Sequence, residues 1–266
     1  MVVRFRATLA YDGSAYQGFQ RQAGDTPTIQ GAVESAVERV TQQRVTVIGA
    51  GRTDAGVHAE GQVISFDVVW RHNDETLLRA INANLPNGIA LQDIRQQEGF
   101  HPRFDAVARV YRYTVVQAAQ RQPLLRCRAW HIMSVIDAAS VVEAASLLVG
   151  VHDFAAFGKP PQGTNTVREV YRSQWDTKPT QYGIMHEYRI EATAFLQHMV
   201  RRIVSSLVGI GQGTLTIAQF HSAITGGVML SGVTLAPPHG LVLEAVRYPT
   251  DEQLMGRRGK RPPEET

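Results

Sequence analysis

The sequence predicts an α+β fold made of two pseudo-symmetric halves. The first observation is that short segments rich in β-branched residues alternate with segments whose apolar residues recur at helical spacing. The second is that this alternation starts again in a similar order halfway along the chain, although no residue-level repeat accompanies it. With 44% hydrophobic and 19% charged residues among 266, the chain can bury an ordinary core.

The predicted order in the first half is strand, helix, strand, strand, helix, strand. Strands are expected at residues 2–10, 45–48, 63–66 and 89–94. The apolar faces of the two helices are formed by Ile29, Val33, Val37 and Val40, and by Leu77, Leu78, Ile81 and Leu85. The first helix follows Thr28, Asn73 or Asp74 can cap the second, and Pro86 ends it. This order is that of a ferredoxin-like unit.

The second half begins in the same way. Strands are expected at residues 107–116, 167–175, 187–194 and 241–246. Asp137 can cap a helix that carries Val141, Val142, Ala145 and Leu148 and is closed by Gly150. Further helices are expected at residues 196–208 and 217–224. We therefore divide the chain into a first half at 1–105, a second half at 106–250 and a basic tail at 251–266 that is expected to be mobile.

The composition narrows the class of protein. No apolar stretch approaches the roughly 20 residues of a membrane span, and the first residues alternate as in a strand, so a cytoplasmic protein without a membrane anchor is expected. The single cysteine, Cys127, excludes an internal disulfide and a cysteine-built zinc site. A pI near 9.2 favours an anionic partner. Residues 95–128 carry seven arginines against two acidic residues, a local excess of 7 − 2 = +5, although a GC-rich genome or a warm habitat could also favour arginine.

The first pattern that suggests chemistry is the glycine-rich loop at residues 49–61. It holds Asp54, with Arg52 two residues earlier, and lacks the Lys-Ser or Lys-Thr of a phosphate-binding loop. The His-Ala-Glu tripeptide at 58–60 resembles half of a zinc deaminase motif, but a chain with one cysteine cannot supply the other half. What remains is a carboxylate held among glycines beside an arginine. Taken alone, such an aspartate is most often a turn residue.

The second pattern is the strand that contains Arg109, Tyr111, Arg112 and Tyr113. Alternation places Arg109 and both tyrosines on one face and Arg112 on the other. Tyrosine beside arginine forms a stacking platform for unpaired bases. The alternative is an ordinary strand whose tyrosines pack in the core and whose arginines are solvated.

The third pattern is a polar stripe on the helix that follows Phe195. His198, Arg201 or Arg202, and Ser205 recur at helical spacing among residues expected to be buried. An unpaired buried arginine costs several kcal/mol, so a carboxylate or a phosphate in a cleft is the expected partner. A stripe that merely faces solvent is the alternative.

Together these patterns resemble the tRNA pseudouridine synthase A family over nearly the whole chain. The segments that carry the resemblance are Tyr11–Gln22, Gly51–Ala59, Asn82–Pro86, Phe100-His101 with Arg103-Phe104, Tyr111–Tyr113, His152–Phe154, Phe195 with His198–Arg201, and Ala236-Pro237 with Gly240-Leu241. The loop with Asp54 is the most specific of them. Arg202 and Ser205 depart from the family, which usually has Asn and Gly there, and residues 158–165 are individual to this chain.

The resemblance implies the fold and the function. It implies two ferredoxin-like halves joined into one extended, mostly antiparallel sheet, with helices on one side and a central catalytic cleft. It also implies a homodimer that binds tRNA across both subunits and converts uridine to pseudouridine in the anticodon arm, at tRNA positions 38, 39 and 40. That reaction oxidises and hydrolyses nothing, so no cofactor or metal is expected.

The resemblance also implies the roles of individual residues. Asp54 is expected to be the catalytic carboxylate and Arg201 the partner that keeps it ionised. Tyr111 is expected to lie on the uracil and to act at C5 directly or through water, and Arg52 to enter the space left by the flipped nucleotide. Further RNA contacts are expected from Arg21, Arg103, Arg109, Arg112, His198 and Arg202. Attack by the carboxylate at C1′, attack at C6 and proton abstraction at C2′ all remain open.

Three alternatives to this function also remain. The first is a pseudouridine synthase that acts on another RNA. The second is a non-catalytic RNA-binding protein on the same scaffold, which would keep the arginines and Tyr111 without needing Asp54 beside an arginine. The third is a metal-dependent nuclease or hydrolase that uses Asp12, Asp54, His58 and His101.

Overall fold

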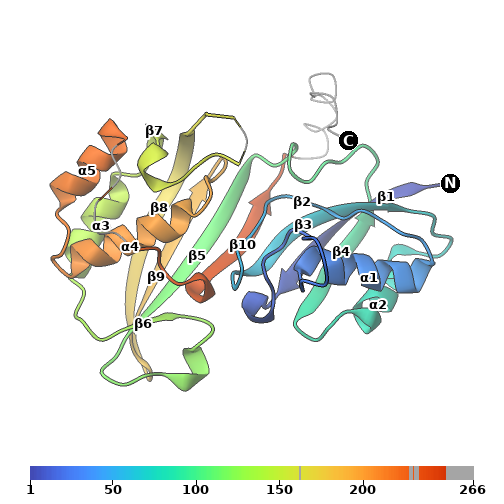
Figure 1. The fold of residues 1–266 in the computed structure, drawn as a ribbon, viewed down its shortest axis with the longest axis horizontal. Coiled ribbons are helices and arrows are strands. Elements are labelled where there is room, and N and C mark those ends of the chain that lie inside the picture. The colour runs from blue at the N-terminus through green and yellow to red at the C-terminus, as the bar shows by residue number, and fades with distance from the viewer. Residues whose placement is uncertain (162, 228–229, 231–233, 250–266) are drawn as a thin grey trace.

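The computed structural model describes residues 1–161, 163–227, 230 and 234–249, so the basic tail predicted at 251–266 lies outside the described residues. The strands are β1 (Val3–Tyr11), β2 (Ile48–Gly49), β3 (His58–Val68), β4 (Ile89–Gln96), β5 (Ala108–Gln117), β6 (Trp130–Ile132), β7 (Gly150–Asp153), β8 (Val167–Thr180), β9 (Gly183–Ala192) and β10 (Leu241–Arg247). The α-helices are α1 (Ile29–Thr41), α2 (Asp74–Asn84), α3 (Ala138–Ser146), α4 (Met199–Gly211) and α5 (Ile217–Gly226). All ten strands belong to one sheet that runs through both halves (Figure 1).

Each half has the same strand order. The first half is ordered β4-β1-β3-β2. Without its short strands β6 and β7, the second half is ordered β10-β5-β9-β8. In both orders the last strand of the half lies beside the first, followed by the third and then the second. A helix follows the first strand and another follows the third in each half. The prediction of two pseudo-symmetric ferredoxin-like halves in one mostly antiparallel sheet is therefore confirmed.

Strand β10, close to the end of the described chain, joins the two halves. It pairs antiparallel with β5 along its length and parallel with the start of β3, where Val242 lies opposite His58 and Leu243 opposite Ala59. Strand β2 pairs with the far end of the same edge of β3. Strand β2 is only two residues long. The loop at residues 50–57, which connects β2 to β3, consequently lies at the junction of the halves.

The helices of both halves cover the same face of the sheet. Directly opposed residues on successive strands point to one face, and the row Tyr11, Ala59, Leu243, Tyr111 and Ile190 crosses from β1 to β9. This row belongs to the two hydrophobic clusters that include α1 and α2 in the first half and α3, α4 and α5 in the second. The predicted placement of helices on one side is confirmed. Within the described residues, no helix has the length and apolarity that crossing a membrane would require.

Most predicted helix starts agree with the structure because local capping sets them. The side chains of Thr28, Asn73 and Asp137 accept hydrogen bonds from the backbone at the starts of α1, α2 and α3. Helix α4 differs, because it begins at Met199 and not at residue 196. His198 before it has a left-handed backbone, with φ 64°, which turns the chain into the helix and stops the helix from starting earlier.

Other differences concern short strands and one helix face. Only Ile48 of the strand predicted at 45–48 pairs with β3, because the backbone of Val47 bonds instead to the buried side chains of Gln30 and Glu34 on α1. Strands β6 and β7 were not predicted, since three or four residues give no measurable alternation. Val142, predicted on the apolar face of α3, is half exposed.

Candidate active site

The side chain of Asp54 reaches from the loop between β2 and β3 to the first turn of α4 in the second half. Its Oδ2 accepts a hydrogen bond from Nη1 of Arg201 at 2.9 Å, and Nε2 of His198 lies 3.5 Å from the same oxygen. The Arg201 side chain is 11% exposed, whereas that of Asp54 is 31% exposed. The cation is therefore largely buried, while part of the carboxylate remains open for a substrate.

Arg201 is held by a second contact that orients its guanidinium. Its Nε donates to the backbone carbonyl of Ala236 at 2.7 Å, which leaves Nη1 directed at Asp54. Ala236 begins a segment that runs to Gly240 and leads into β10, and we call residues 236–240 the strap. The strap is therefore hydrogen-bonded to Arg201, the same residue that pairs with Asp54.

Residues from β1 and from the segment after it shape the loop that carries Asp54. The Tyr11 hydroxyl and the Thr53 hydroxyl are hydrogen-bonded at 2.8 Å, and the Phe19 amide donates to the Thr53 carbonyl at 3.1 Å. Gly18 has φ 93°, and a Cβ there would lie 2.7 Å from the Thr53 carbonyl oxygen. Nε2 of the fully buried Gln62 also donates to the Gly51 carbonyl at 2.7 Å. The backbone is therefore held at Gly51 and at Thr53, directly before Asp54.

Tyr111 lies in the row of residues that crosses the sheet between the two halves and contacts both hydrophobic clusters. Its ring packs edge-on against Phe195, with 5.1 Å between the centroids. Burial raises the pKa of the Tyr111 hydroxyl to about 12; the Arg109 cation acts in the opposite direction, and the Asp54 carboxylate adds to the increase. At pH 7 only about one molecule in 10⁵ would carry the phenolate. The hydroxyl is therefore a neutral hydrogen-bonding group at the working pH.

The other predicted contact residues are placed in different ways. Arg52 is exposed on the catalytic loop, and its Nε donates to Gln20 at 3.1 Å. Arg202 donates to the Phe157 carbonyl at 3.2 Å. The remaining ones lie away from the carboxylate: Arg21 pairs with Glu34 at 2.9 Å, and the Arg103 guanidinium lies 5.8 Å from the Phe104 ring. The structure thus brings Arg201, His198 and Tyr111 to Asp54, and the roles of all these residues remain predictions.

Arg109 and Arg112 are engaged by the protein itself. The Arg109 guanidinium donates to four backbone carbonyls, and burial lowers its pKa. Arg112 lies on the face opposite Tyr111, where it pairs with Glu60 and Glu244. Tyr113 is fully buried and donates to the Pro237 carbonyl at 2.7 Å, so for this residue the core interpretation holds. Contact of either arginine with RNA stays a prediction.

The four residues of the metal-dependent alternative do not come together. Nδ1 of the buried His58 lies 3.2 Å from the Asp12 carboxylate, whereas Asp54 is paired with Arg201. His101 packs its ring against Phe104, with 4.2 Å between the centroids. Among the described residues, no group of three or more histidine, cysteine or acidic side chains is arranged to hold a metal ion.

Several supporting residues gave no usable signal in the sequence. Phe195 contacts Tyr111 from a position distant in the sequence, so spacing cannot relate them. Gln62 stands in a strand where a polar residue is expected to face solvent, and only the structure shows its buried contact with the loop. Residues at both ends of the strap carry part of the family resemblance, but the contact of Ala236 with Arg201 joins two segments of the second half that are far apart in the sequence, so spacing does not show it.

Comparisons with known proteins agree over most of the chain. The profile of a family described as tRNA pseudouridine synthase matches residues 7–105 and 144–249. A protein of Chloroflexus aurantiacus named tRNA pseudouridine synthase A is 44% identical over 244 residues, which cover 91% of this chain and 87% of that protein. Proteins of the same name from Neisseria gonorrhoeae and Methylacidiphilum infernorum are 40% and 39% identical, over 92% and 95% of this chain and 92% and 98% of their own lengths.

Proposed function

The chain belongs to the tRNA pseudouridine synthase family, and we propose that it converts uridine to pseudouridine in the anticodon arm of tRNA, at positions 38, 39 and 40. The observation that carries this proposal is the ion pair of Asp54 and Arg201, formed between the two halves and close enough to Tyr111 for the Asp54 charge to raise the pKa of its hydroxyl. A protein that only bound RNA would have no need of a carboxylate there, because a negative charge repels phosphates.

The proposed reaction is an isomerisation. The N1–C1′ bond breaks, the uracil turns, and C5 joins C1′ with loss of the C5 proton. Arg201 donates to the Asp54 carboxylate at 2.9 Å, and a carboxylate in this position is competent to attack C1′, to attack C6 or to remove the C2′ proton. All three routes require the reacting atom of the nucleotide to lie against the exposed part of the Asp54 side chain.

The target nucleotide must leave the RNA stack before any of these steps. Unstacking costs on the order of a few kcal/mol, and a side chain that fills the space lowers this cost. We assign that role to Arg52, because it is exposed and lies two residues before Asp54 on the same loop. We assign contacts with the surrounding RNA to Arg21, Arg103, His198 and Arg202.

Tyr111 is proposed to stack on the uracil and to direct the removal of the C5 proton. Burial raises the pKa of the Tyr111 hydroxyl to about 12, so the hydroxyl is neutral in the free protein. Removal of the C5 proton by Tyr111 directly and removal through a water molecule both remain proposals.

We expect Tyr111→Phe to lower the single-turnover rate on the order of 10²-fold while the tRNA dissociation constant stays within about threefold. Phenylalanine keeps the stacking face and removes only the hydroxyl. Tyr171→Phe, at an exposed tyrosine on β8, serves as the matched control. A Tyr111→Phe enzyme with the wild-type rate would show that Tyr111 is a platform and takes no part in proton transfer.

The assembly and location follow from the same proposal. We expect a homodimer that holds one tRNA across both subunits, as the family resemblance implies, and we expect the enzyme in the cytoplasm, where its substrate is. Sedimentation of the protein with and without tRNA measures both the oligomeric state and the stoichiometry.

The decisive experiment is to incubate the purified protein with unmodified tRNA transcripts and to map pseudouridine chemically by position. We expect modification at uridines 38, 39 and 40 and none in transcripts whose three positions are cytidine. Modification confined to another site or another RNA would replace the anticodon-arm assignment. Tight binding without any pseudouridine would favour the non-catalytic alternative.

A further inference from the structure

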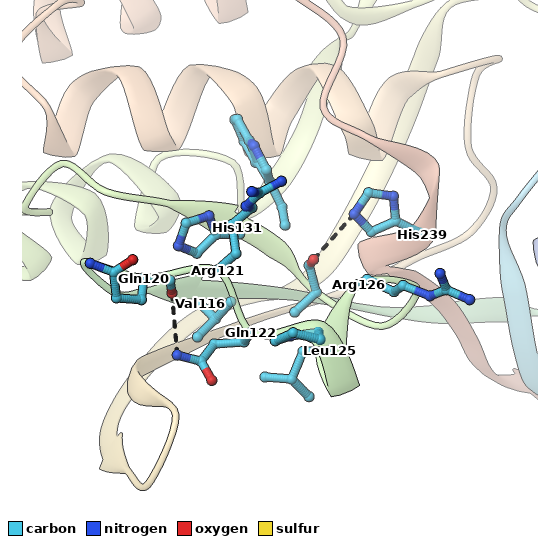
Figure 2. Close-up of a pocket in the computed structure, with 11 residues that line it drawn as sticks. Val116, Gln120, Arg121, Gln122, Leu125, Arg126, His131 and His239 are labelled. Atoms are coloured by element: carbon cyan, nitrogen blue, oxygen red, sulfur yellow. Dashed lines mark hydrogen bonds between the residues drawn. The ribbon is translucent and has the colours of Figure 1, made fainter.

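A groove in the second half lies outside the candidate active site. It has a volume of about 690 Å³ and is formed chiefly by the connection between β5 and β6. Its lining includes Arg121, Leu125, Arg126, Trp130, His131 and His239. In Figure 2, Arg126 and His239 lie toward one end of the groove, and His131 and Gln120 toward the other.

The charged side chains in the lining of the groove are two arginines, Arg121 and Arg126. Residues 106–136 contain no aspartate or glutamate. The Arg121 and Arg126 side chains are exposed, and neither has an acidic partner among the residues that the structure describes. Neighbouring Arg128 is different, because it donates to the Asp12 carboxylate at 2.8 Å and thereby ties this connection to the first half. Two arginines are thus left to face a ligand in a groove that also presents a half-buried tryptophan.

The strap connects the groove to the candidate active site. His239, on the strap, bonds through Nε2 to the Ala129 carbonyl at 3.1 Å, and burial lowers its pKa, so it is neutral at pH 7 and donates this hydrogen bond. At the other end of the strap, Ala236 accepts from Arg201. Pro238 packs close to Gly56 on the catalytic loop, where an added Cβ would lie 3.1 Å from it. The strap therefore contacts both Arg201 of the candidate active site and Ala129 in the lining of the groove.

We propose that this groove binds the phosphodiester backbone of the tRNA beyond the flipped nucleotide, through the Arg121 and Arg126 guanidiniums. Arginine presents a planar fork that matches phosphate oxygens, and a groove that combines arginines with a half-buried tryptophan in its lining is suited to RNA. The proposal rests on the proposed function, because it takes tRNA as the ligand. It adds a subsite that positions the substrate without touching the reacting atoms.

The test is the salt dependence of tRNA binding by the double variant Arg121→Gln/Arg126→Gln. Each lost phosphate contact reduces the slope of log K against log salt by roughly 0.7–0.9, so we expect a reduction of about 1.5 and a weakening on the order of tenfold at 0.15 M salt. At saturating tRNA we expect a rate close to that of the wild type. Arg121→Lys/Arg126→Lys should keep the wild-type slope, because the charges remain.

The matched control is Arg39→Gln/Arg79→Gln, two exposed arginines on α1 and α2 in the other half (Figure 1). A double variant in the groove with the wild-type slope, or with a change no larger than that of this control, would overturn the proposal. If the wild-type protein forms no pseudouridine, the proposed function is wrong. That result is independent of the salt dependence measured for the groove variants. Thermal unfolding of each variant should match the wild type, since the substituted side chains are exposed.

Discussion

Asp54→Asn is expected to lower the rate of pseudouridine formation by at least about 10⁴-fold, while the affinity for tRNA stays within a few-fold. Losses of this size follow the removal of a nucleophile or a general base. Asparagine has nearly the same shape, but its amide cannot attack carbon or take a proton from the sugar. The RNA-binding surface does not change, and one negative charge that repels phosphate is removed, so binding should be equal or slightly tighter.

The measurement is single-turnover pseudouridine formation at saturating enzyme, with binding followed separately by filter retention of labelled tRNA. Asp25→Asn, at an exposed position in the loop before α1, is the matched control and should retain full activity. Asp54→Glu keeps the charge but moves the carboxylate by one methylene, so we expect a large loss there too. Substantial turnover by Asp54→Asn would sink the catalytic assignment.

The sequence predicted the architecture well where a repeating pattern was long enough. Helix α1 could be placed from the spacing of Ile29, Val33 and Val37, all fully buried in the structure. The extent of β2 could not be predicted, because the backbone of Val47 bonds to the side chains of Gln30 and Glu34 on α1 and does not pair with β3. Bonds between backbone and helix side chains leave no trace in a local hydrophobic pattern.

The pairing of Asp54 with an arginine at the candidate site could also be predicted. A buried arginine on α4 requires an anionic partner. This requirement, together with the family resemblance, indicates Asp54 as the partner from the sequence alone. Several supports of the site were not predictable, because they are backbone groups. Examples are the Ala236 carbonyl that orients Arg201 and the Thr53 carbonyl beside Gly18, and a backbone carbonyl is present at every residue.

The pairing of Asp54 with Arg201 gives the second large effect. We expect Arg201→Gln to lower the single-turnover rate about 10²- to 10³-fold, the loss typical of removing one electrostatic contact from a catalytic site. Glutamine cannot supply a charge at 2.9 Å from Oδ2, and it leaves the Ala236 carbonyl without its charged donor. The second loss should cost about 1–3 kcal/mol of stability in thermal unfolding. Arg201→Lys restores the charge without the fork, so only part of the rate should return.

A double-mutant cycle separates an effect through the carboxylate from a general loosening of the strap. If Arg201 acts on the rate through the charge of Asp54, then Arg201→Gln should change the residual rate of the Asp54→Asn enzyme by less than about threefold, because residues that act as a unit are not additive. If Arg201→Gln only loosened the strap, it would slow the wild-type enzyme and the Asp54→Asn enzyme by the same factor. Full additivity of the two substitutions would therefore contradict the ion pair as the functional link between the halves, and would leave Arg201 as a support for residues 236–240 alone.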